Sequence, residues 1–328
     1  MLDRLKVVVS AFVLSALFAS APQTAAQPWP AKPITLIVPF SAGGGVDSAA
    51  RIVAPKLGEI LKQPVVIENV AGAAGTIGTA RVVKSPPDGY TLLFAVASPI
   101  NVAPVVSPSV VRYDTFKDLT PLSTVASAPF VLIGRPTLSA KSMAELIAQA
   151  KAQPGKLNFG TDGVGGSLHI AGELINQRAG IDLVHTAYKS GPQVLTDVSA
   201  GHVDLGILPL TLAQPFIRDG KVRAFGVTSK ARWPTAPDVP ALAETPALAD
   251  FEIDSWLGVL APANLDPAIA ATLIRALASI AQDADVVRKM TEVAVKPMTV
   301  AGPAFTQYLQ RERQLIRDVV QKAGIKVE

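Results

Sequence analysis

A glycine-rich segment near the start of the chain has the residue types of an anion-binding turn. The segment SAGGGVDSAAR follows the apolar run 34–40 and places Gly43, Gly44 and Gly45 before residues suited to a helix. Glycine permits positive φ and close approach of a ligand to the backbone. The first turn of a helix offers unpaired N–H groups at the positive end of its dipole. A strand, a glycine turn and a helix start in this order predict a site for a small anion.

The residues after these glycines indicate which anion is expected. A phosphate-binding P-loop needs Lys and Ser/Thr after its last glycine, and Val46 and Asp47 stand there instead. The dinucleotide fingerprint would place glycine where Ser48 stands. Asp47 would repel a phosphate chain but tolerate a carboxylate held mainly by backbone N–H groups, so we favour a carboxylate. Asp47 also suits the N-cap of its helix, a role that does not exclude the first. Pro55 is expected to kink this helix or end it early.

The same arrangement occurs again about 120 residues later. A predicted strand at 157–161 leads into the loop DGVGG at 162–166 and a predicted helix at 167–178, with Ser167 as N-cap and Gly180 as stop. Two such turns on two domains, facing each other across a cleft, predict a clamshell.

A third glycine turn and two polar residues extend the candidate site. Gly72, Gly75 and Gly78 follow the predicted strand 65–69, and Thr76 adds a hydroxyl. Ser98 and Asn101 follow the predicted strand 91–97, where parallel strands of an open sheet present ligand groups. Ordinary loop capping is the alternative role for both polar residues.

Catalysis and metal binding have weaker support. Ser167 with His169, His185 and His202 would be the parts of a hydrolase triad, but His169 stands where the nucleophile elbow has glycine, two residues along the same helix. The histidines also suit surface or packing positions. Without cysteine or a His pair at i, i+4 spacing, neither thiol chemistry nor a metal site is expected.

The N-terminus has the three parts of a secretory signal peptide. Arg4 and Lys6 precede the apolar segment 7–18, and small residues continue to Ala26, after which we place the cleavage site. No cysteine is present for a lipoprotein anchor, so a free periplasmic protein is expected. The net charge of +4, scattered basic residues and 5% aromatic content give little support for nucleic-acid binding.

Short apolar runs alternate with helical patterns, which predicts an α/β fold. About 300 residues follow Ala26, enough for two domains. We assign residues 27–127 with 251–328 to domain 1 and 128–250 to domain 2. Further strands are expected at 130–135, 183–187, 203–208, 223–228 and 256–261, and further helices at 139–153, 192–200, 267–283, 285–293 and 302–323. The proline-rich segment 233–246 is expected to be an irregular connection running back toward domain 1.

An ordered set of motifs covers nearly all of the mature chain: WPAKPITLIVPFSAGGGVDSAAR, VVIENVAGAAGTIG, PPDGYTLLFA, KLNFGTDGVGGSLHIAGELI, AYKS, GHVDLGI and KVRAFGVTSKARWPTAPDVPALAE. In this order they resemble the Bug or TctC-like extracytoplasmic receptors of tripartite tricarboxylate transporters. The resemblance implies a two-domain periplasmic binding protein fold of the type II kind, a carboxylate-bearing ligand in the cleft, no cofactor, and delivery to a membrane permease. We expect a monomer that binds no nucleic acid.

The resemblance also implies which residues meet the ligand, largely through backbone N–H groups, hydroxyls and water. By position they are Phe40, Ala42, Gly43, Gly44, Asp47, Gly75, Thr76, Ser98, Thr161, Gly163, Gly165, Gly166, Ser167 and Tyr188. The alternatives are a periplasmic hydrolase that uses Ser167 and a sensory binding protein that signals ligand presence. The effector-sensing domain of a regulator would have the same clamshell arrangement. The signal peptide and the missing DNA-binding segment argue against this alternative.

Overall fold

The computed structural model describes residues 29–325, so the predicted signal peptide at 1–26 lies outside the described residues. Within 29–325, no helix has the length and apolar character needed to cross a membrane. The strands are β1 (Ile34–Val38), β2 (Val65–Asn69), β3 (Thr91–Ala95), β4 (Leu119–Gly134), β5 (Asn158–Thr161), β6 (Val184–Ala187), β7 (Leu205–Pro209), β8 (Arg223–Val227), β9 (Asp254–Pro262) and β10 (Lys296–Pro297).

Helices alternate with these strands, as the sequence predicted. The longer ones are α2 (Gly45–Leu61), α3 (Thr76–Val83), α6 (Met143–Ala152), α7 (Ser167–Ala179), α8 (Gly191–Ala200), α9 (Leu210–Arg218), α10 (Pro267–Ile280), α11 (Ala284–Glu292) and α12 (Pro303–Ala323). The short ones are η1 (Ala73–Gly75), η2 (Ser98–Val102), α4 (Ala103–Val106), α5 (Thr115–Asp118), η3 (Leu242–Glu244) and η4 (Pro246–Leu248). The α/β class is therefore confirmed.

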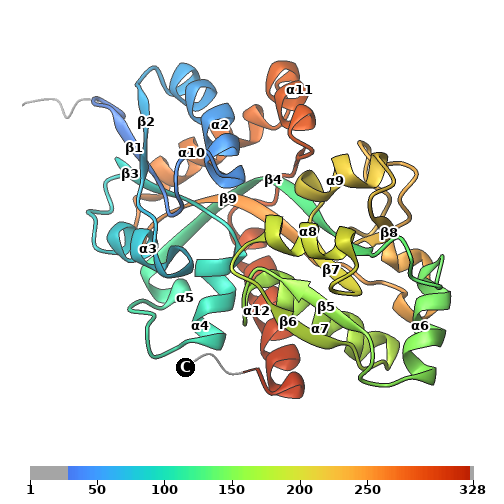
Figure 1. Ribbon diagram of the computed structural model, residues 1–328. Helices are drawn as coiled ribbons and strands as arrows, with labels where there is room; N and C mark the ends of the chain where they lie inside the picture. Colours follow the sequence, from blue (N-terminus) through green and yellow to red (C-terminus); the bar gives the residue numbers. More distant parts are fainter. Residues whose placement is uncertain (1–28, 326–328) are drawn as a thin grey trace, which may run out of the picture.

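The strands form two lobes that share β4 (Figure 1). In the first lobe the strand order is β2-β1-β3-β9-β4, with β10 also on β4; β1 runs parallel to β2 and β3, whereas β9 is antiparallel to β3 and β4. In the second lobe β5 lies parallel to β6 and β7, and both β7 and β8 are antiparallel to β4. The carboxyl ends of β1 and β5 therefore carry the two glycine turns.

Strand β4 passes from one lobe into the other without a break. Leu119 to Pro129 pair with β9, whereas Phe130 to Gly134 pair with β7 and β8. The sequence predicted only the second half of this strand, because the first half contains Pro, Ser and Thr. Burial is possible there because the hydroxyls are satisfied: the Thr124 hydroxyl, for example, donates to the Met298 carbonyl at 3.0 Å.

The expectation that Pro55 ends its helix early was wrong. Helix α2 continues to Leu61 with Pro55 inside it. Pro55 lies on the exposed face of α2, opposite the buried Val53, Ala54 and Leu57. The carbonyl that loses its helical partner therefore faces water, which can hydrogen-bond to it.

The segment 233–246 is irregular apart from η3, as expected, but it does not run straight back to domain 1. It packs on the second lobe, where Ala241 forms a bridge with Val227 of β8 and Trp233 is 1% exposed. Trp233 then reaches the first lobe through its Nε1–H, which donates to the Ala294 carbonyl at 3.2 Å.

Helix α12 contacts both lobes on the side of the molecule away from α2 (Figure 1). Its Phe305 and Leu309 belong to the same buried cluster as Leu93 of the first lobe and Phe159 of the second. The Leu309 carbonyl accepts from Asn101, and the Val319 carbonyl accepts from Gln177 of α7. The apolar core is thus continuous from one lobe to the other along α12.

Candidate ligand-binding cleft

The first glycine turn joins β1 to α2. Gly43 has φ +81°, in the region that favours glycine, and Gly44 is the N-cap residue with φ −78° and ψ 168°. The first hydrogen bond of the helix runs from Ser48 N–H to the Gly44 carbonyl at 2.9 Å. The N–H groups of Gly45, Val46 and Asp47 precede that bond, so α2 presents unpaired donors at the end of β1.

The expectation that Asp47 is the N-cap was wrong, since Gly44 occupies that position and Asp47 is the third helical residue. The Asp47 side chain is buried and turns back to the loop: its Oδ2 accepts from Gly43 N–H at 2.8 Å and from Arg51 Nε at 2.8 Å. Its Oδ1 accepts from Asn69 Nδ2 at 3.0 Å. The Arg51 guanidinium is the main cause that lowers the pKa of Asp47 to about 2. Through these hydrogen bonds, the buried Asp47 carboxylate stabilises the conformation of the first glycine turn.

The second glycine turn has nearly the same backbone. Gly165 has φ +71°, and Gly166 is the N-cap with φ −80° and ψ 170°. Ser167 was expected as N-cap but is the first helical residue; Gly180 ends α7 in the left-handed conformation, as predicted. The first helical bond runs from Ile170 N–H to the Gly166 carbonyl at 3.0 Å. The N–H groups of residues 167–169 are therefore left without a helical partner.

A histidine supports the second turn as Asp47 supports the first. Gly165 N–H donates to Nδ1 of His169 at 3.0 Å, four residues along, as Gly43 does to Asp47. His169 Nε2 lies 3.6 Å from a Glu173 carboxylate oxygen, which places a proton acceptor on the other side of the ring. This pairing favours the tautomer with a bare Nδ1, the form that accepts from Gly165.

In the third turn, around η1, the nearby hydroxyl groups donate hydrogen bonds to backbone carbonyls of the turn. The Thr76 hydroxyl donates to the Ala73 carbonyl at 2.9 Å, and the Ser98 hydroxyl donates to the Ala74 carbonyl at 3.2 Å. Gly75 has φ +91°, and a Cβ atom there would lie 3.2 Å from the Phe40 ring. Asn101, expected to face a ligand, is instead buried between Leu309 and Arg313 of α12.

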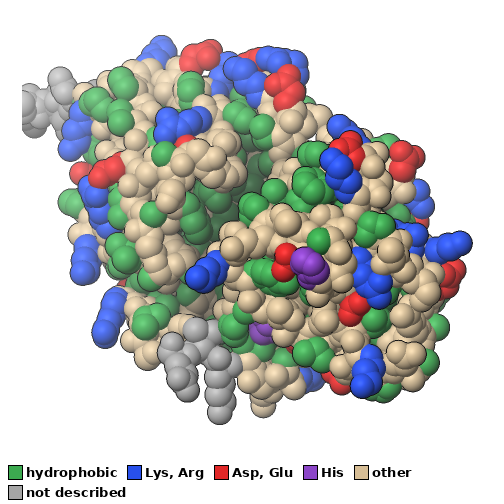
Figure 2. Space-filling model, in the orientation of Figure 1, with side chains coloured by type: hydrophobic (Ala, Val, Ile, Leu, Met, Phe, Trp, Pro, Cys, Tyr) green, Lys and Arg blue, Asp and Glu red, His purple; other side chains and the backbone are tan. Residues whose placement is uncertain are grey.

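The segments that contain the two turns border a common cleft of about 490 Å³ between the lobes, with Phe40 and Val46 from the first segment and residues 162–168 from the second; it is visible as the hollow with hydrophobic walls in Figure 2. Of the residues predicted to bind ligand, those lining the cleft are Phe40, Ser98, Gly163, Gly165, Gly166 and Ser167. Asp162 and Val164 also line it and belong to the predicted loop 162–166. The other lining residues were not predicted, and most are small or apolar: Val46, Ala74, Val96, Ala97, Val102, Ala103, Val106, Ser107, Phe130, Leu168, Pro209 and Ser255. The cleft therefore brings together residues from both lobes and from the strands that join them.

The remaining predicted residues do not line the cleft. Ala42, Gly43 and Gly44 form the exposed part of the first loop, and Thr161 is buried below the second. Asp47, Gly75 and Thr76 are likewise buried behind the lining. Tyr188 lies in a separate depression beside α8, where its hydroxyl donates to Asp197 at 3.0 Å.

A neighbouring groove of about 560 Å³ shares five lining residues with the cleft, among them Val46, Phe130 and Ser255. It continues past Gln214 and Arg218 of α9 toward Glu292 at the end of α11. The cleft is thus open to solvent along the boundary between the lobes.

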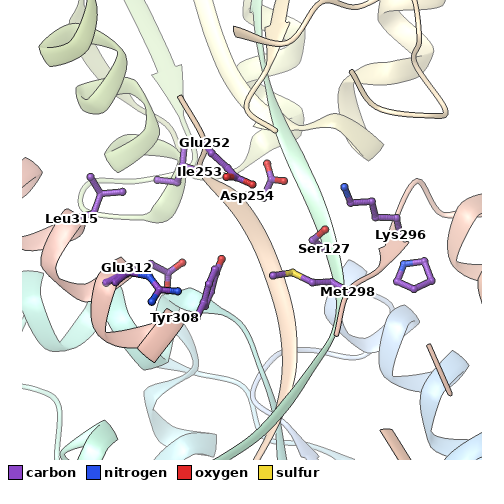
Figure 3. A pocket seen from close by; sticks show the side chains of 11 residues that line it. Ser127, Glu252, Ile253, Asp254, Lys296, Met298, Tyr308, Glu312 and Leu315 are labelled. Atoms are coloured by element: carbon purple, nitrogen blue, oxygen red, sulfur yellow. The ribbon is translucent and has the colours of Figure 1, made fainter. Parts of the chain in front are cut away.

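A further cavity of about 350 Å³ lies against α12 and the ends of β9 and β10 (Figure 3). Its charged lining residues are Glu252, Asp254, Lys296, Arg311 and Glu312. Burial raises the pKa of both Asp254 and Glu312 to about 7. This cavity contains none of the residues predicted to bind ligand.

The hydrolase geometry is not formed among the described residues. No hydrogen bond joins Ser167 to His169 within 29–325, because Nδ1 of His169 accepts from Gly165 and Nε2 faces Glu173. No group of three or more His, Cys, Asp or Glu with metal-binding geometry occurs in the described residues. The cleft between the two glycine turns brings together six of the fourteen predicted ligand-binding residues.

Comparison with known proteins agrees with this geometry. Residues 49–325 match the model of the tripartite tricarboxylate transporter family receptor. The chain belongs to the TctC receptor family. Protein BugT of Bordetella pertussis is 35% identical over 328 residues, which is 100% of this chain and 99% of that protein. TctC receptors are periplasmic solute-binding proteins, so the resemblance stated from the motifs is confirmed.

Two solved structures of similar proteins contain carboxylates. R. palustris Rpa4515 with adipate has a TM-score of 0.76 and 30% identity, covering 91% of this chain and 99% of its own. MatC from Rhodopseudomonas palustris with bound malate has a TM-score of 0.72 and 28% identity, covering 89% of this chain and 100% of its own. The two-domain TctC fold predicted from the sequence is confirmed.

Proposed function

We propose that this TctC receptor captures a small carboxylate-bearing ligand in the cleft and delivers it to the membrane permease of a tripartite tricarboxylate transporter. The observation that carries the proposal is the convergence of two glycine-capped helix N-termini on one cavity. Unpaired N–H groups at a helix N-terminus bind anions without a charged side chain. The adipate and malate bound by similar receptors support the same ligand class.

The proposal includes the expected site residues and domain limits. Residues of the two turns, of η1 and of the strand ends would hold the ligand directly or through water, with Asp47 and Thr161 acting behind the loops. The limits 27–127 with 251–328 and 128–250 are supported by the change of partner along β4 between Pro129 and Phe130. We propose a monomeric, periplasmic receptor without cofactor or catalytic activity.

The strength of binding expected from these groups is sufficient. A micromolar complex requires about 8 kcal/mol. Hydrogen bonds to a charged group contribute roughly 1.5–3 kcal/mol each, and a helix terminus adds about 0.3–1 kcal/mol. Several amide donors on one carboxylate therefore reach this range after the cost of ordering the ligand.

Calorimetric titration with mono-, di- and tricarboxylates tests the proposal, and saturable heat with at least one of them is the expected result. The variant Gly44→Val should weaken that binding by more than it lowers the free energy of unfolding. A Cβ atom at Gly44 would lie 3.5 Å from the Ser41 carbonyl oxygen, an ordinary contact, so the fold should tolerate it. Absence of binding across the panel would contradict the proposal. Ester hydrolysis abolished by Ser167→Ala would support the hydrolase instead.

Delivery to a permease is tested in cells. Deleting the gene for this chain should abolish uptake of the ligand found by calorimetry, while uptake of an unrelated nutrient continues. Unchanged uptake combined with a loss of ligand-dependent gene expression would support the sensory alternative.

A further inference from the structure

The cleft contains a single ionisable side chain. Among the described residues that line it there is no Lys, Arg or His, and the one acidic residue is Asp162. No side chain within 29–325 forms a hydrogen bond or salt bridge with the Asp162 carboxylate, and Asp162 is exposed to solvent in the cleft. The lining of the cleft itself therefore offers a ligand one anionic acceptor, and the one Arg of the adjoining groove, Arg218, lies outside this lining.

The walls between the two turns are largely apolar. Phe40, Val102 and Val106 face the cleft from the first lobe, and Phe130 and Leu168 from the second. A charged group placed against these side chains would lose water without gaining a counter-ion. The middle of the bound ligand is therefore expected to be hydrocarbon, either aliphatic or aromatic.

The two turns differ in the charge that accompanies their amides. At the first turn, Asp47 is buried behind the loop and paired with Arg51, so α2 lines the cleft through Val46 and the Asp47 carboxylate does not face the ligand space. At the second turn, Asp162 lies in the cleft wall beside the amides of α7. A ligand carboxylate is attracted to the first turn, whereas the Asp162 charge opposes one at the second.

We infer that the ligand is an organic acid with one carboxylate at the α2 turn, an apolar body, and a hydroxyl or amino donor at its far end that Asp162 accepts. This inference rests on the proposed function of the cleft as a carboxylate receptor. Asp162 excludes a second carboxylate at the far end through charge repulsion and unpaired acceptors. Asp162 is thus the residue that sets specificity among carboxylates.

Titration calorimetry of the mature receptor with two matched series tests this inference. The first series is benzoate, 4-hydroxybenzoate and terephthalate; the second is hexanoate, 6-hydroxyhexanoate and adipate. In at least one series we expect the hydroxy acid to bind about 10-fold more tightly than the unsubstituted acid, since a hydrogen bond to a charged group has this effect. The diacid of that series should bind more weakly than the hydroxy acid by a similar factor.

The variant Asp162→Asn has nearly the same shape without the charge. It should weaken binding of the hydroxy acid several-fold and strengthen binding of the diacid. The preference for the hydroxy acid over the diacid should therefore become smaller or reverse. Asp182→Asn, an exposed position of the second lobe outside the cleft lining, should leave both affinities unchanged.

The outcomes separate the inference from the proposed function. Tighter binding of a diacid or tricarboxylate than of any hydroxy acid, or an Asp162→Asn variant with unaltered preference, overturns the inference and leaves the receptor function intact. No binding of any carboxylate, in these series or in the wider panel, overturns the receptor function itself.

Discussion

The imidazole rings of His169 and His185 are stacked, with ring centroids 3.6 Å apart and planes 15° from parallel. His169 comes from α7 and His185 from β6. His169 is hydrogen-bonded to the second glycine turn, and His185 is hydrogen-bonded to Thr161, which directly precedes the turn. His169 accepts from Gly165 N–H, and His185 Nε2 lies 2.7 Å from the hydroxyl of Thr161, which donates to the Gly163 carbonyl. Protonation of His185 is therefore coupled to the shape of the turn.

Stability should fall in mild acid because of His185. Burial, aided by the neighbouring His169, lowers the pKa of His185 from 6.5 to about 4. Between these values the unfolded chain binds the proton and the folded protein does not, so the stability from neutral His185 is present above pH 6.5 and lost as the pH falls toward 4. The shift sets an upper limit of roughly 3 kcal/mol on this loss, which solvent around the partly exposed ring reduces. Urea unfolding at a series of pH values should show this loss in the wild type and a smaller loss in His185→Gln.

The control for that experiment is His202→Gln. His202 is exposed, with 71% of its side chain accessible and its Nδ1 3.5 Å from an Asp197 carboxylate oxygen, so its replacement removes one histidine without touching the stacked rings. Equal slopes for the wild type and His185→Gln would show that burial of His185 does not oppose its protonation.

His169 should act on ligand binding by positioning the Gly165 amide. His169→Leu removes the acceptor of a buried N–H group, which costs about 1–3 kcal/mol of stability, and should weaken ligand binding about 10-fold. His169→Asn restores an acceptor atom near the place of Nδ1 and should recover most of the affinity. The measurement is calorimetric affinity together with unfolding free energy. If the Asn variant binds as weakly as the Leu variant, the histidine contributes packing alone.

Glu312 should destabilise the protein at alkaline pH. It lies on α12, where it accepts from Trp256 Nε1 at 2.9 Å, and burial raises its pKa from 4.5 to about 7. The folded state therefore binds this proton more strongly than the unfolded chain does. The resulting stabilisation is fully present below pH 4.5 and is lost as the pH rises through 7. Glu312→Gln should raise the unfolding free energy at pH 8 by roughly 1–3 kcal/mol and have less effect at pH 5.

Asp318→Asn serves as the comparison for Glu312→Gln because it changes an exposed carboxylate on the same helix. It should change stability by less than about 0.5 kcal/mol at either pH. A Glu312→Gln variant that is less stable than the wild type at pH 8 would mean that the carboxylate is needed in its charged form.

Asp47 should be important for stability and binding although it does not line the cleft. Asp47→Ala leaves Gly43 N–H and Asn69 Nδ2 without this acceptor, so a loss of about 2–3 kcal/mol is expected in urea unfolding, together with weaker ligand binding. Arg51→Gln removes only the partner whose side chain is 56% exposed and should cost less than about 1 kcal/mol. Similar losses for the two variants would assign the effect to the ion pair instead of to the loop.

The sequence predicted features that follow from local backbone rules. Three glycines between an apolar run and a helix pattern are sufficient to predict the turn at Gly43, and the same holds at Gly165, because positive φ and the N-cap depend on neighbours in the chain. Side-chain roles were less predictable. Asp47 was assigned to the helix end, whereas its partner Asn69 comes from another strand and has no local signal.

The apolar part of the cleft was also missed for a physical reason. Phe130 was predicted as the start of an ordinary strand, and Val102 and Val106 gave no motif at all, so only the fold shows that they face the same space. Asp162 was recognised as part of a loop, but its isolation from any basic side chain appears only in three dimensions. The sequence therefore predicted the main-chain part of the site better than the part that distinguishes ligands.

The nearly identical dihedral angles of Gly44 and Gly166 have an evolutionary consequence. Every residue except proline has a peptide N–H group, whatever its side chain. Mutations in the cleft wall therefore leave the N–H donors of the two helix N-termini in place. After gene duplication, a receptor with this fold can therefore change its ligand specificity by substituting a few side chains of the cleft wall. The backbone N–H groups that bind the anion stay the same.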